Sequence, residues 1–195
     1  MLGASSVIFY TIPKSLLENG RNLILTLSEV FLPYFSYLHG KNQLRQMQTA
    51  YLFASKVTVS ILVLLLVGFN QWGAVFIEMW LEPDLIPNLS LIINLLCLQV
   101  LISGFAPLSG RFLSAIDMHK FFAVWVPPFS LLKFALMLFF CHHYGIIGLV
   151  AAPLLPSLVF LLILHYKVCK HLEISVKEHF FKIHLPIVIP AIVLK

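Results

Sequence analysis

The sequence predicts an all-α integral membrane protein, a polytopic helix bundle with five spans and the start of a sixth. Of its 195 residues, 60% are hydrophobic and 11% are charged, whereas soluble domains carry about 25% charged residues. The apolar residues form long uninterrupted runs separated by brief polar stretches, as membrane helices do and membrane β-strands do not. Composition and patterning together exclude a soluble globular enzyme.

The expected spans belong to one helical domain that covers residues 1–195. They lie at about 5–38, 49–69, 86–107, 121–141 and 146–166, followed by an incomplete one at 183–195. The first exceeds the roughly 20 residues of a perpendicular crossing, so we expect it to be tilted, kinked near Pro13 or extended beyond the lipid. The stretch from Trp72 to Leu81 places Trp72 and Trp80 at an interfacial aromatic belt. We expect it to form a short separate helix on the membrane surface.

The basic residues predict the orientation, because cytoplasmic loops are enriched in Lys and Arg. The basic residues that follow the first, third and fifth spans are Lys41, Arg45, Arg111, Lys120, Lys167, Lys170, Lys177 and Lys182. The opposite loops, 70–87 and 142–145, contain none. The amino terminus is therefore expected outside, and with an unfinished last helix this indicates part of a larger protein. Since the positive charges are spread singly, the net charge of +5 reflects orientation and not nucleic-acid binding.

Charged side chains inside the spans are the candidate functional residues. The first span carries Lys14, Glu18 and Arg21 at i, i+4 and i+7, and Glu29 continues roughly the same face. Lys133 lies near the middle of the fourth span. Intramembrane charges are costly and often mark a transport path, so these residues form a candidate substrate cavity. Two interpretations of the first-span group stay open: a wall that meets an anionic substrate, or neutralisation of Lys14 and Arg21 by Glu18.

Other polar features of the spans have structural explanations. Asn94 and Gln99 are expected to join helices through hydrogen bonds, and Lys56 to reach the interface with its long stem. The cysteines, Cys97, Cys141 and Cys169, show no metal or redox spacing, so we expect them to be buried. Without a phosphate loop or nucleophile motif, the chain is not expected to be an enzyme, and we expect no cofactor and no metal site.

Several short motifs, in order, resemble one transporter family. They are Gly3-Ala-Ser-Ser-Val-Ile-Phe-Tyr10, Pro33-Tyr-Phe-Ser36, Ile77-Glu-Met-Trp80-Leu, the stretch 114–120, and Tyr144-Gly145-Ile-Ile-Gly148. Together they cover nearly the whole chain. The sequence is similar to polysaccharide and O-antigen lipid flippases, a branch of the multidrug/oligosaccharidyl-lipid/polysaccharide exporter superfamily, in the carboxy-terminal part. Glu82 and the Asp117-Met118 pair depart from the family pattern.

The resemblance implies export of a lipid-linked oligosaccharide across the cytoplasmic, or inner, membrane by alternating access between two helix bundles. The expected partners are the lipid-linked glycan, the lipid bilayer and an amino-terminal half of the transporter. Arg21, Lys14 and Lys133 would attract the diphosphate, while Glu18 and Glu29 would tune these cations or couple transport to an ion. Two alternatives remain: a drug/cation antiporter of the same superfamily, or a truncated membrane fragment that does not transport.

Overall fold

The computed structural model describes residues 4–79 and 89–179, and within these ranges all regular secondary structure is helical. The helices are α1 Ala4–Gly40, α2 Leu44–Glu78, α3 Leu89–Gly104, α4 Ala106–Ala115, α5 His119–Ala151, α6 Leu154–His171 and the short α7 Val176–His179. The described part of the chain is thus all-α, as its composition predicts.

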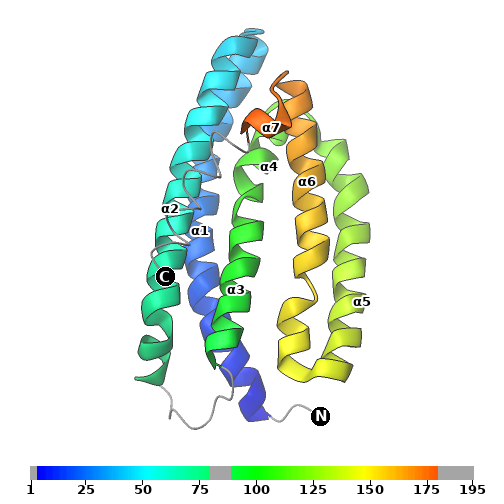
Figure 1. Ribbon diagram of the computed structural model, residues 1–195. Coiled ribbons are helices and arrows are strands. Elements are labelled where there is room, and N and C mark those ends of the chain that lie inside the picture. Colours follow the sequence, from blue (N-terminus) through cyan, green and yellow to red (C-terminus); the bar gives the residue numbers. More distant parts are fainter. Residues whose placement is uncertain (1–3, 80–88, 180–195) are drawn as a thin grey trace.

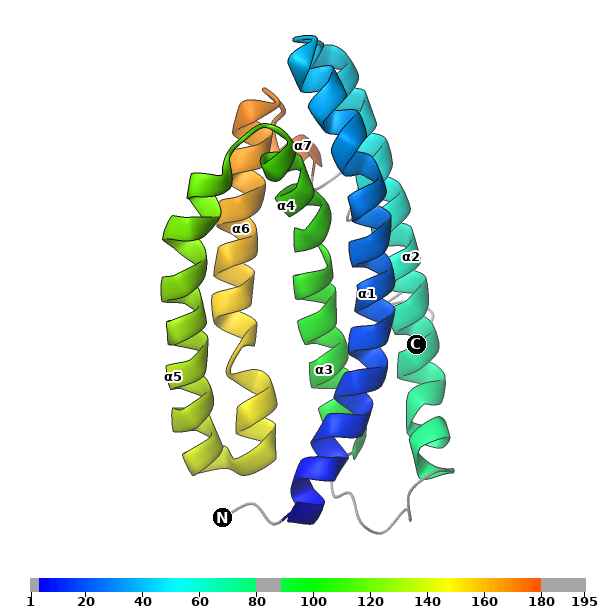
Figure 2. The same ribbon diagram turned by 180° about the vertical axis from the view of Figure 1, so that it is seen from behind.

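The long helices run alternately up and down in a single bundle (Figure 1). Seen from either side, α1 and α2 form one edge, α5 and α6 form the other, and α3 with α4 lies between them (Figure 2). Helix α1 packs against α2, α3 and α4, while α6 packs against α3, α4 and α5. The bundle is therefore held together mainly through α1 on one edge and α6 on the other.

The core consists of two main clusters along the bundle axis. One joins α1, α2 and α3 through buried residues such as Ile24, Leu62 and Ile93. The other is aromatic: Phe35 meets Phe112 edge to face at 5.3 Å between ring centroids, a favoured geometry for aromatic pairs. There the buried Tyr51 hydroxyl lies 2.8 Å from Ser109 Oγ, a hydrogen bond that offsets the cost of burying both groups.

Three helices end in the same way at one end of the bundle. Two residues beyond the ends of α1, α4 and α6, a non-glycine residue adopts positive φ: Asn42 at 54°, Asp117 at 60° and Glu173 at 54°. The next residue donates its N–H to a carbonyl five residues earlier, as when Gln43 bonds Leu38 at 3.1 Å. This is the Schellman motif, which satisfies helix-terminal carbonyls. The basic residues of the predicted cytoplasmic loops that the structure describes lie at or near these helix ends, apart from Arg111.

Helices α5 and α6 form an antiparallel pair that turns at a glycine. Gly145 has φ 61° and ψ −139°, a conformation that breaks the helix between Tyr144 and Ile146. Three residues later the chain packs so closely on α5 that a Cβ on Gly148 would overlap the Phe140 carbonyl oxygen and lie 2.7 Å from its carbonyl carbon. Both glycines are therefore required by the turn.

Three helical stretches of the described chain are long and apolar enough to cross a membrane: Leu44–Gly73, Leu89–Ala115 and His119–His171. The last contains both α5 and α6, and the charged helix α1 is not among the three. Large apolar side chains are exposed on the outside of the bundle, for example Leu64, Leu131 and Leu155. Soluble monomers rarely expose so much apolar surface, so this exterior is consistent with a membrane protein.

Two details of the sequence-based prediction are wrong. Helix α2 continues unbroken through Trp72 to Glu78, so no separate surface helix begins at Trp72, because nothing after Phe69 breaks the helix. Pro107 does not end a span but lies in the first turn of α4, a position that proline favours, so Arg111 lies in a helix and not in a loop. Trp80, Leu81 and the expected start of a sixth span at 183–195 fall outside the described residues.

The Gly148 contact gives a test of the hairpin. We expect Gly148→Ala to destabilise the protein in detergent by about 1–3 kcal/mol, the usual cost of overpacking, because backbone atoms must move. Gly68→Ala in α2 is the matched control, since an added Cβ there meets nothing within 4 Å and alanine favours the helix. Denaturant unfolding followed by circular dichroism measures both. Equal stability of the two variants would contradict the close packing at Gly148.

Candidate functional site

The charged group of the first predicted span forms an ion pair on α1. Arg21 Nε donates to Glu18 Oε2 at 2.6 Å, one turn away, and both side chains are about one-third exposed. Lys14 lies half-buried one turn before Glu18. Glu18 therefore neutralises Arg21, as one of the two interpretations predicts. The donor is Nε, so the two Nη nitrogens of the guanidinium are not the donors of this bond.

Lys133 lies on the far edge of the bundle, half-buried on α5. On α1, Arg21 is the charged residue whose positive charge acts on Lys133. Among the described side chains, no carboxylate lies within ion-pair distance of Lys133. Two cations that are far apart in the sequence thus interact electrostatically, one from α1 and one from α5.

The electrostatics of this arrangement favour an anion. Lys14, Arg21 and Lys133 are cations, and Glu18 is the carboxylate paired within the set. A positive excess between apolar helices is costly unless a counter-charge or water is present. A phosphate or diphosphate would supply that charge and accept hydrogen bonds from both an ammonium and a guanidinium. We call Lys14, Glu18, Arg21 and Lys133 the cation cluster.

Glu29, the remaining candidate, is not part of this cluster. Its Oε1 accepts a 2.6 Å hydrogen bond from Arg111 Nη2 on α4, with side chains 56% and 36% exposed respectively. Sequence reasoning assigned Arg111 to a loop and missed this pair. No local signal in the sequence could have found it, because the two partners are 82 residues apart.

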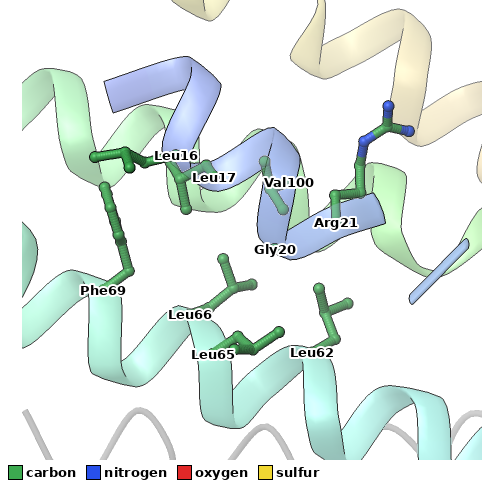
Figure 3. Close-up of a pocket in the computed structure, with 9 residues that line it drawn as sticks. All are labelled: Leu16, Leu17, Gly20, Arg21, Leu62, Leu65, Leu66, Phe69 and Val100. Carbon is green, nitrogen blue, oxygen red and sulfur yellow. The ribbon is translucent and has the colours of Figure 1, made fainter. Parts of the chain in front are cut away.

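A small cavity lies beside the cation cluster, between α1, α2 and α3 (Figure 3). Its volume is about 90 Å³, below the roughly 300–1,000 Å³ of sites for drug-sized ligands. It is lined by Leu16, Leu17, Gly20, Arg21, Leu62, Leu65, Leu66, Phe69 and Val100. Figure 3 shows the Arg21 guanidinium pointing away from the apolar side chains. The cavity is therefore an apolar packing space, and the guanidinium of Arg21 does not point into it.

Of the two polar residues predicted to join helices, Asn94 does so, whereas the buried Oε1 of Gln99 has no hydrogen-bond partner in the described part of the chain. Asn70 Nδ2 donates to Asn94 Oδ1 at 2.7 Å and so joins α2 to α3, the role expected for Asn94. Cys97 and Cys169 are buried, whereas Cys141 is half-buried. In the ranges that the structure covers, no group of three or more His, Cys, Asp or Glu side chains is placed to hold a metal ion.

The Glu29–Arg111 pair can be measured by a double-mutant cycle with Glu29→Gln, Arg111→Gln and the double variant. Ion pairs in water contribute about 0.2–1 kcal/mol. We expect a coupling free energy above about 1 kcal/mol in lipid nanodiscs, because water screens the pair poorly beside apolar helices. Lys56→Gln, which removes an exposed charge from α2, controls for the general effect of charge. A coupling free energy near zero would show that the pair is fully solvated.

Comparisons of the chain with protein-family models, with curated proteins and with solved structures find no match. The geometry of the bundle and its charges is therefore what supports a function.

Proposed function

We propose that this chain is a helical bundle of a transporter that moves a lipid-linked oligosaccharide across the cytoplasmic membrane by alternating access. In this proposal α1, α2, α3 with α4, α5 and α6 are five crossings. The positively charged helix ends face the cytoplasm. The cation cluster binds the diphosphate that links the glycan to its polyprenyl lipid.

Two observations carry the proposal: the Arg21 guanidinium on α1 points away from the apolar cavity (Figure 3), and Lys133, half-buried on α5, has no carboxylate within ion-pair distance among the described side chains. A half-buried cation without a carboxylate partner is costly, and an anionic ligand would offset that cost. A site shared between separate helices is also the kind that changes when helices move, as alternating access requires. The motif order in the sequence, which resembles lipid-glycan flippases, agrees with an anionic substrate.

The drug/cation antiporter alternative is less well supported. Such a transporter needs a carboxylate available to a cation, yet both carboxylates considered for that role are paired with arginine: Glu18 with Arg21 and Glu29 with Arg111. The remaining alternative is a bundle that does not transport, and only a transport assay distinguishes it from the proposed function. Movement of a fluorescent lipid-linked sugar across reconstituted vesicles would exclude it.

Binding of undecaprenyl diphosphate to the full chain in nanodiscs tests the role of the cation cluster. We expect Arg21→Gln with Lys133→Gln to raise Kd at least tenfold, because each charge-assisted hydrogen bond contributes about 1.5–3 kcal/mol. Binding to the unaltered chain should weaken as salt is added.

Two controls make the result specific. Lys56→Gln should leave Kd unchanged, since this residue is exposed on α2, and undecaprenol, which has the tail without the phosphates, should bind equally to all variants. If the double variant binds undecaprenyl diphosphate as tightly as the original chain, the assignment of the cluster is wrong.

A further inference from the structure

The outer face of α1 carries an unusual row of residues. Its positions follow one another at alternating steps of four and three, and all are exposed: Ser15, Asn19, Asn22, Thr26, Glu29, Pro33, Ser36 and Gly40. We call this row the α1 seam. None of its side chains is a large hydrophobe, although the chain as a whole is 60% hydrophobic.

The seam lies opposite the side of α1 that enters the core. Leu17, Ile24 and Phe35 are buried, and at 100° per residue they lie about half a turn from Asn22 and Thr26. The seam is bordered by α4 on one side, where Arg111 donates to Glu29 and Ser36 Oγ donates to the Ala115 carbonyl at 3.4 Å. On its other side are the exposed apolar residues Leu23 and Val30.

This pattern does not suit a helix face that meets lipid tails. Exposed amides, hydroxyls and an ion pair are disfavoured in hydrocarbon. A 4-3 repeat is instead the spacing along which two helices pack side by side. Small and hydroxyl-bearing residues at such a seam allow close approach, and amide side chains form hydrogen bonds between membrane helices.

We propose that the seam is the contact between two copies of this chain, with the two α1 helices parallel about a two-fold axis normal to the membrane. The inference rests on the proposed membrane function. Parallel repeats about such an axis are an established transporter architecture. A second copy also brings its own cation cluster to the same side of the interface.

A second copy fits because the seam is complementary to itself. About a two-fold axis each residue approaches its own counterpart, and an asparagine amide both donates and accepts, so Asn19 and Asn22 can pair reciprocally. Glu29 and Arg111 supply both charges at one level of the seam. Glu29 of each copy can therefore bind Arg111 of the other copy, and no charge is left unpaired.

Disulfide formation between copies tests the contact. Asn22→Cys is introduced together with Cys141→Ala, which removes the half-buried native thiol, while Cys97 and Cys169 stay buried. In vesicles at high lipid excess, mild oxidation should convert most of the chain to a covalent dimer. Leu64→Cys, on the exposed side of α2, is the matched control and should give at most a few per cent.

A second measurement covers the case in which the cysteine variant is poorly folded. Asn19→Leu with Asn22→Leu should weaken dimerisation at least tenfold in a dilution series followed by single-molecule photobleaching. Ser130→Leu, an exposed polar position on α5, should not. Monomers at all dilutions, or Asn22→Cys that reacts with a membrane-impermeant maleimide but does not cross-link, would overturn the proposal.

These results are separable from those for transport. A covalent dimer that fails to bind undecaprenyl diphosphate leaves the α1 contact standing and removes the proposed substrate. A monomer that binds undecaprenyl diphosphate overturns the contact and leaves the substrate standing.

Discussion

In the proposed membrane arrangement, the rest of the structure depends on one constraint: α1, which holds the bundle together, must keep its polar groups out of hydrocarbon. A charged residue in the middle of a membrane helix costs about 2.5–3.5 kcal/mol on insertion scales, and α1 carries Lys14, Glu18, Arg21 and Glu29. Its buried face supplies core residues to both main clusters. Two ion pairs involve its charged residues: Arg21 pairs with Glu18, and Glu29 pairs with Arg111 on α4.

The other helices follow from this role of α1. Helix α4 packs on α1 near one end of the bundle, where Phe35, Tyr51 and Phe112 form a buried cluster, and Arg111 reaches Glu29 from there. The Arg21 guanidinium points away from the apolar cavity, and Lys133 on α5 is the other half-buried cation considered for the site. The α5–α6 hairpin, fixed by Gly145 and Gly148, positions that lysine. The polar residues of α1 thus connect both edges of an otherwise apolar structure.

Much of this architecture could be predicted from local sequence. Long apolar runs predict helices, and the loop expected at 142–145 contains Gly145, whose positive φ turns the chain. Asn94 as a helix-joining residue is confirmed by its bond to Asn70. The Glu29–Arg111 pair could not be predicted, because its partners are 82 residues apart and no local pattern specifies which helices meet. The interaction of Lys133 with Arg21 depends in the same way on tertiary packing. The end of the third span at Pro107 was predicted wrongly because proline both ends helices and begins them.

The central claim is that lipid is excluded from the polar outer face of α1. Spin labels placed one at a time along residues 15–37 in a bilayer report this through their collisions with dissolved oxygen, which concentrates in hydrocarbon. The account predicts low oxygen accessibility at positions 19, 22, 26 and 29, against high values at Leu23 and Val30, which are exposed and apolar. Oxygen accessibility as high at Asn22 and Thr26 as at Leu23 and Val30 would contradict it.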